Sequence, residues 1–182
     1  FYALVTLLAA GHPTVFLRAQ ALGLTGRELP EAVDRNRALR DRIEAIQRAA
    51  AARIGFDLGA GPQRSLLPRV VWVGRPTAYR SAGGVDISAD RVDLLARTIS
   101  QGRLEPSLAA GCAMAIAVAA ALPGTVVNEI ARTLPGVPTR IGHVTGTLAV
   151  GAEVEFSAGQ WQVDKVVLSR SARRLMSGWV HV

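Results

Sequence analysis

The chain has 182 residues, 49% of them hydrophobic, which is enough for one domain with a core of its own. Its formal net charge of +7 suits a nucleic acid or a small anionic ligand, or simply reflects an arginine-rich composition. The basic residues are spread along the chain and only 5% of residues are aromatic, which argues against a surface that stacks on bases. We therefore expect no nucleic-acid partner.

The cysteine and histidine content argues against a disulfide-rich protein and against a metal site. Cys112 is the single cysteine, so the chain has neither a disulfide framework nor a cysteine zinc site. The three histidines, His12, His143 and His181, lack metal-ligand spacing, and no metal is expected. The N-terminus lacks the basic segment of a signal peptide, and the uncharged stretch 106–128 has too short a helical part to span a membrane. We expect a cytoplasmic protein.

Two strands come first in the predicted chain order. Residues 1–8 alternate as a strand does, and residues 14–18 form a second strand after a turn at Gly11-His12-Pro13. Since the chain begins inside a strand, we interpret it as lacking a segment upstream.

A long amphipathic helix is predicted after a connector in which Thr25 and Glu28 have capping-box spacing. It runs from Asp34, which can cap it, to Arg53, and Gly55 provides a natural end. One face of this helix is an apolar stripe made of Leu39, Ile43, Ile46, Ala50 and Ile54.

The middle of the chain is predicted to contain a strand at residues 69–74, extended at 77–81, and a turn at Gly83-Gly84. Ser88 then opens a predicted helix. Three apolar residues share one face of that helix: Val92, Leu95 and Ile99.

An alanine-rich helix over residues 107–122 has no polar face, which is typical of a helix buried on all sides. A shorter helix is predicted at 126–133, and strands follow at 147–156, 161–168 and 175–182. Strands on both sides of one apolar helix predict an α+β domain, a curved, mostly antiparallel sheet wrapped around that helix, with residues 1–182 forming a single domain.

The order of several short motifs resembles that of the PrpF family, and the resemblance covers nearly the whole chain. The motifs are Ala10-Gly-His-Pro-Thr-Val-Phe-Leu-Arg18 with Leu22-Gly-Leu-Thr-Gly26, Asp93-Leu-Leu-Ala-Arg97, Ser100-x-Gly-Arg-Leu104, Pro123-Gly-Thr-Val-Val127, Gly142-His-Val-Thr-Gly146, and Arg170-Ser-Ala-Arg-Arg-Leu-Met176 with Gly178. The first and the last of these motifs are fairly specific, whereas the middle ones alone would be weak.

The resemblance implies the fold of diaminopimelate epimerase, in which two similar halves enclose the active site between them. This chain resembles the C-terminal half, and the N-terminal half, with the family's reactive lysine and cysteine, is absent from it. The resemblance also implies isomerisation or tautomerisation of small unsaturated polycarboxylates by proton transfer, without a cofactor. Homo-oligomer formation is left open.

The candidate site residues come from two glycine turns. Gly142, Thr145 and Gly146 belong to a turn whose backbone amides and threonine hydroxyl are suitable donors to a substrate carboxylate, and an ordinary turn that leads into a strand is the alternative. His12 lies in the first turn, where the family usually has asparagine, and it too is a candidate for substrate binding or simply a turn residue. Cys112, near the start of the alanine-rich helix, is a candidate acid or base, weighed against a buried packing role.

Several positions depart from the family pattern. Ala9 replaces a usual aspartate, Glu105 stands where histidine is frequent, and Val144 replaces a usual proline. The main hypothesis is therefore the C-terminal half of an isomerase acting on a 2-methylaconitate, aconitate or oxalomesaconate type of acid. The alternative is a non-catalytic PrpF-like module retained for its fold or for a partner.

Overall fold

The computed structural model describes residues 2–55, 67–100, 102–169 and 174–179, and within these its main element is a mixed sheet of eight strands. The order across the sheet is β1-β2-β3-β6-β8-β9-β10, with β7 paired to β6. The strands are β1 Val5–Ala10, β2 His12–Arg18, β3 Arg69–Gly74, β6 Leu94–Ser100, β7 Arg103–Leu104, β8 Thr139–His143, β9 Gly146–Ser157 and β10 Gln160–Leu168. The β2–β3 and β6–β8 pairs are parallel and the other pairs are antiparallel. The expected mostly antiparallel sheet is therefore confirmed.

The remaining elements are short, apart from two helices. A separate two-stranded sheet is formed by β4 Tyr79–Arg80 and β5 Asp86–Ile87. The helices are α1 Pro30–Asp34, α2 Arg37–Arg53 and α3 Ala110–Ala121, with single 3-10 turns at Ala19–Leu22 and Ala89–Arg91. None of the helices in the described ranges is long and apolar enough to cross a membrane.

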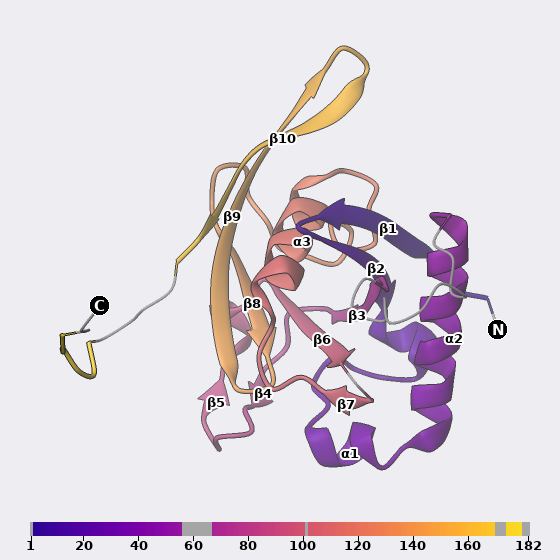
Figure 1. Ribbon diagram of the computed structural model, residues 1–182, viewed down its shortest axis with the longest axis vertical. Helices are drawn as coiled ribbons and strands as arrows, with labels where there is room; N and C mark the ends of the chain where they lie inside the picture. The colour runs from indigo at the N-terminus through magenta and orange to yellow at the C-terminus, as the bar shows by residue number, and fades with distance from the viewer. Residues whose placement is uncertain (1, 56–66, 101, 170–173, 180–182) are drawn as a thin grey trace.

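Helix α3 is the most apolar element, and it lies against the inner face of the sheet (Figure 1). Nearly all of its residues from Cys112 to Ala120 are buried, since small alanine side chains let strands approach closely. The end strands of the sheet, β1 and β10, both contact α3. A flat sheet could not bring both of its ends to one helix, so the sheet curls towards α3.

Both faces of the central strands are buried, as the alternation along β3 shows. Val71 and Val73 pack in the cluster that contains α3, whereas Val70 and Trp72 pack on the other face with residues of α2. A strand buried on both faces reads as a continuous apolar run, which is what residues 70–73 are. The predicted strand at these positions is confirmed.

Helix α2 has most of the expected apolar stripe, except that Ile54 is 42% exposed at its end, and it has a different beginning. Leu39, Ile43 and Ala50 are buried against the sheet. The cap is Asn36, whose side chain accepts a hydrogen bond from the Leu39 amide at 3.0 Å. Asp34 ends the separate helix α1, and its carboxylate instead accepts from the Leu104 amide at 2.8 Å. The prediction that Asp34 caps the long helix is therefore wrong.

The helix predicted to begin at Ser88 is also wrong. Residues 89–91 form a 3-10 turn and residues 94–100 form strand β6, at the centre of the sheet. Leu94, Leu95 and Ala96 are all fully buried, so β6 lacks the alternation that would have distinguished it from a helix.

Three smaller predictions also need correction. The segment Val126–Ile130 forms hydrogen-bonded turns instead of a helix, with the hydroxyl of Thr125 bonded to the Ala119 carbonyl. Leu175 to Trp179 form no strand, and residues 180–182 lie outside the described ranges, as do Phe1 and 170–173. The first strand begins at Val5, and the extension expected at 77–81 is β4, in the separate sheet.

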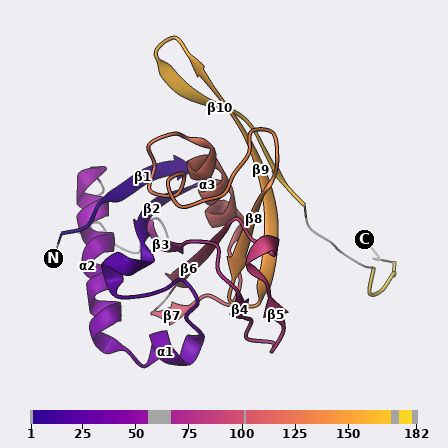
Figure 2. The same cartoon turned by 180° about the vertical axis from the view of Figure 1, so that it is seen from behind.

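The β9–β10 hairpin continues beyond the body of the domain (Figures 1 and 2). Near its turn Phe156 is 59% and Trp161 45% exposed, and their rings lie 5.3 Å apart in a tilted arrangement. The strand predictions at 147–156 and 161–168 are confirmed.

Candidate functional site

The N-terminus of α3 is the point where the two predicted glycine turns meet the rest of the chain. Ala109 occupies the cap position, and no side chain provides a capping hydrogen bond. The first backbone amides of a helix have no partner within the helix, and the helix dipole gives this end a partial positive charge. Such an end favours an anion.

The β1–β2 turn packs directly against this end of α3 (Figure 2). A Cβ added at Gly111 would lie 3.3 Å from the His12 Cβ, and one added at Gly11 would lie 3.1 Å from the Met114 Cε. Gly11 also has a φ of +84°, which favours glycine. Two glycines therefore bring His12 beside α3. The His12 ring is half-buried, and its Nδ1 lies 2.9 Å from the carbonyl oxygen of Pro13.

The β8–β9 turn contacts the same segment of chain from another side. The Thr145 amide and hydroxyl both donate to the Pro106 carbonyl, at 3.2 and 3.0 Å. Pro106 lies four residues before α3 begins, so the turn is fastened to the chain that leads into the helix. The two Thr145 donors expected for a carboxylate are thus bonded within the protein. Gly142 and Gly146 lie on either side, paired to Thr147 and His143.

His143, in the middle of this turn, is a candidate that sequence reasoning did not select. Its Nδ1 lies 3.3 Å from the Thr145 Oγ1 and 3.4 Å from the Pro106 carbonyl oxygen. Burial of the ring is the main cause that lowers the pKa of His143, and the nearby positive charge of Arg97 acts in the same direction. The imidazole is therefore neutral at neutral pH and able to accept a proton. Its position inside the Gly142–Gly146 motif was the available signal.

A second missed feature is the ion pair between Arg69 and Glu105. Arg69 is the first residue of β3, and Glu105 immediately precedes Pro106. The two side chains are only 26% and 16% exposed, and Arg69 Nη1 donates to Glu105 Oε1. Arg69 thus provides a partly exposed cation near the start of α3.

Cys112 lies within the core instead of in a cleft. It is fully buried among the residues that pack around α3. Burial raises the pKa of its thiol to about 12, which favours the protonated thiol at neutral pH. This environment agrees with the packing role that was weighed for it.

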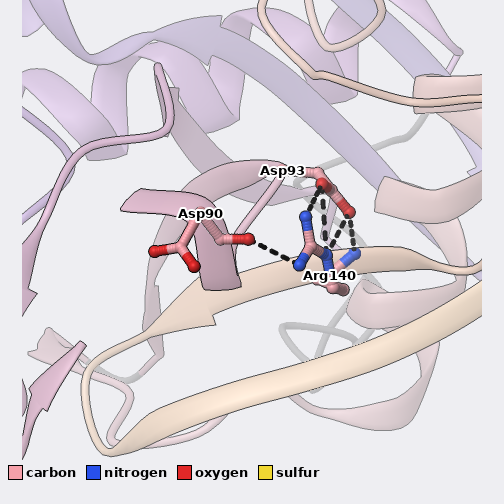
Figure 3. Close-up of polar contacts among 3 residues, drawn as sticks. All are labelled: Asp90, Asp93 and Arg140. Atoms are coloured by element: carbon pink, nitrogen blue, oxygen red, sulfur yellow. Dashed lines mark hydrogen bonds and ion pairs between the residues drawn. The ribbon is translucent and has the colours of Figure 1, made fainter. Parts of the chain in front are cut away.

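A hollow of about 220 Å³ near the beginning of β8 is lined by a different polar cluster, shown in Figure 3. Asp93, 6% exposed, accepts from the Arg140 amide at 2.7 Å and from its Nη2 at 2.6 Å. Arg140 Nη1 in turn donates to the Asp90 carbonyl at 2.6 Å. The charged groups of Asp93 and Arg140 are bonded to each other, and Asp90 joins them through its backbone carbonyl, so the cluster fastens β8 to the segment before β6. Within the described residues, no group of three or more His, Cys, Asp or Glu side chains could hold a metal ion.

The fold and the site together define the class of protein to which the chain belongs. A solved structure described as methylitaconate-delta-isomerase superposes with a TM-score of 0.84 at 29% identity, and the match covers 97% of this chain and 46% of that one. The sequence profile described as PrpF protein matches residues 3–182. The chain belongs to the PrpF family.

Curated relatives carry related names. A 2-methyl-aconitate isomerase of Shewanella oneidensis is 39% identical over 97% of this chain and 45% of its own length. A 3-methylitaconate isomerase of Eubacterium barkeri is 31% identical over 98% and 47%, and a (4E)-oxalomesaconate Delta-isomerase of a Novosphingobium strain is 31% identical over 98% and 45%. The chain therefore spans about half the length of the curated relatives it matches.

Proposed function

We propose that this chain is the C-terminal half of a cofactor-independent isomerase or tautomerase that moves a proton along a small unsaturated polycarboxylate of the 2-methylaconitate, aconitate or oxalomesaconate type. The observation that carries this proposal is the convergence of two glycine turns on the N-terminus of α3, in a chain of the PrpF family. The names of the relatives support the class of substrate.

The proposed chemistry has simple requirements. A base removes a proton from a carbon next to a carboxylate or carbonyl, the electron pair moves into the conjugated system, and a proton is added at another carbon. The intermediate carries extra negative charge on oxygen, which needs hydrogen-bond donors. The first amides of α3 and the other N–H groups of Arg69 suit that charge, since Arg69 uses one of its N–H groups on Glu105. Neutral His143 suits a proton acceptor or relay.

The proposal leaves the principal base and acid to the rest of the protein. The full burial of Cys112 and the raised pKa of its thiol support a packing role for this residue in the proposal. A two-halved protein of the diaminopimelate epimerase type would close the site from the opposite side with its own reactive side chains. The half-buried N-terminus of α3 would then lie at the cleft between the halves.

One observation favours the alternative of a non-catalytic module. Both Thr145 donors are bonded to the Pro106 carbonyl, and binding of a carboxylate by this turn would have to displace that bond. Departures from the family pattern at Ala9, Glu105 and Val144 lie near the same two turns.

A proton-exchange measurement distinguishes the proposed isomerase from the non-catalytic module. The protein that carries this chain is incubated in D₂O with aconitate, 2-methylaconitate, methylitaconate and oxalomesaconate, and deuterium incorporation is followed by NMR. An isomerase incorporates deuterium at the carbons that gain and lose the proton. Absence of incorporation from every acid in the panel would sink the enzymatic proposal and leave the module.

A further inference from the structure

Arg97 in β6 holds a buried charge against the β8–β9 turn. Its relative exposure is 1%, and its N–H groups donate to backbone carbonyls: Nε to Glu28 at 3.0 Å, and Nη1 to Ala96 at 2.9 Å and Gly142 at 3.1 Å. In the part of the chain that the structure describes, Arg97 forms no ion pair, and its Nη2 has no hydrogen-bond partner. The Glu28 carboxylate attracts this cation from beyond ion-pair distance. A buried charge outside an ion pair is unfavourable, so its presence calls for a reason other than stability.

Tyr79 in β4 is the second residue that holds the β8–β9 turn. Its hydroxyl donates to the Gly146 carbonyl at 2.5 Å, and its ring centroid lies 5.4 Å from the Arg97 Cζ. The cation is thus placed over the aromatic ring, an arrangement that partly offsets the missing counter-ion. One contiguous Arg97–Tyr79 pair therefore fixes the carbonyls at both ends of the turn.

Gly142 is explained by the same contact. A Cβ at this position would lie 2.7 Å from the Leu95 Cδ2 and 3.0 Å from the Tyr79 Cε1, so a side chain here would force Leu95, Tyr79 or the strand to shift. Gly142 is not among the glycines with positive φ, which leaves close approach as its structural reason.

We propose that Arg97 and Tyr79 are positioning residues that preset the Gly142–Gly146 turn for a carboxylate-bearing ligand. A carbonyl bonded to Arg97 or Tyr79 no longer presents its partial negative charge to an anion, and the guanidinium adds positive charge behind the turn. The inference rests on the proposed function for the identity of the ligand. The support of the turn itself can be measured without any ligand.

The first measurement is amide hydrogen exchange of Thr145, whose N–H bonds to Pro106, relative to the slowest amides of α3. Arg97→Met, Arg97→Lys and Tyr79→Phe are compared with Arg53→Met, which removes one exposed charge at the end of α2. We expect Thr145 exchange about tenfold faster in Arg97→Met, smaller changes in the two conservative variants, and none in Arg53→Met, since one charge-assisted hydrogen bond corresponds to about a factor of ten.

The second measurement is binding of propane-1,2,3-tricarboxylate, followed through the Gly142 and Gly146 amide signals. The expected result is about tenfold weaker binding in Arg97→Met and unchanged binding in Arg53→Met. If Thr145 exchange is unchanged in both Arg97→Lys and Tyr79→Phe, the proposal that the pair holds the turn is overturned. These two variants decide the question even if Arg97→Met fails to fold. If the unsubstituted chain does not bind the probe, the ligand part of this inference fails, while Thr145 exchange still decides whether the pair holds the turn. The substrate class is decided separately, by deuterium incorporation in the protein that carries this chain.

Discussion

The carbonyl oxygen of Pro106 accepts two hydrogen bonds from Thr145, one from its amide at 3.2 Å and one from its hydroxyl at 3.0 Å. This pair of bonds joins the β8–β9 turn to the segment that leads into α3. It places residues separated by 39 positions in one short contact, and it determines which donors of the turn remain available.

Replacing Thr145 by valine removes the hydroxyl and keeps the branched shape. Because Thr145 is exposed, we expect a loss of only about 0.5–1 kcal/mol in the free energy of unfolding, the net value of a single hydrogen bond. Thr145→Ser keeps the hydroxyl and should remain close to the original stability. Urea unfolding of the three proteins measures the difference. Equal stability of the valine variant would show that the hydroxyl bond is not maintained in solution.

The fold was predictable where the sequence pattern matched one structure only. The alternation at residues 147–156 gave β9, and the alanine-rich run gave α3. The prediction for the segment that forms β6 was wrong because its residues are apolar on both faces of the strand. Val92, Leu95 and Ile99 also fit a helical spacing. Pairing of β6 with β3 and β8 decided the outcome, and this pairing depends on contacts distant in sequence.

The candidate site was predictable only in part, for a similar reason. The glycine turns are local features and could be found from their residues. Arg69 and Glu105 are separated by 36 positions, and only the sheet brings them together, so no local pattern marks the pair. The hydrogen bond from the Thr145 hydroxyl to the Pro106 carbonyl is likewise a contact between residues distant in sequence.

The Arg69–Glu105 pair offers a test of long-range coupling near α3. Removing either partner alone leaves a mostly buried charge uncompensated, and we expect Arg69→Met and Glu105→Leu each to cost about 2 kcal/mol, between the values for exposed and buried pairs. The double variant should cost less than the sum of the two single variants. Urea unfolding of all four proteins gives the coupling energy directly. Strict additivity would mean that the two side chains do not interact in solution.

The pH dependence of stability should carry a contribution from His143. Burial lowers the pKa of this ring, so the native state binds a proton less readily than the unfolded state, whose histidine pKa is about 6.5. The contribution to stability is therefore present above about pH 6.5 and is lost as the pH falls from there towards the folded-state pKa.

His143→Gln removes this titration. The difference in unfolding free energy between about pH 7.5 and 5, which brackets the unfolded-state pKa, should be smaller in the variant than in the original chain. An NMR titration of the His143 ring is the direct check, and its midpoint should lie below that of an unfolded histidine. A midpoint at or above the unfolded value would contradict the neutral imidazole on which its proposed role as proton acceptor depends.

The reactivity of the Cys112 thiol distinguishes a packing role from a catalytic one. It can be measured directly because Cys112 is the single cysteine of the chain. A thiol that is fully buried and has its pKa raised to about 12 can react with a disulfide reagent only after the surrounding structure opens. In the native chain at pH 8 we expect reaction with 5,5′-dithiobis(2-nitrobenzoate) to be about 1,000-fold slower, or more, than in guanidinium chloride, because open forms are populated at 10⁻³ or below.

The matched control is Ser107→Cys in a Cys112→Ala background, which places an exposed thiol just before the same helix. This thiol feels the same end of α3 but is in contact with solvent, so it should react at close to the rate of a free thiol. If native Cys112 reacts as fast as the control, the thiol is accessible, and an acid–base role for Cys112 would have to be restored. If only the control reacts, the burial of α3 accounts for Cys112, and the acid and base of the proposed reaction lie elsewhere.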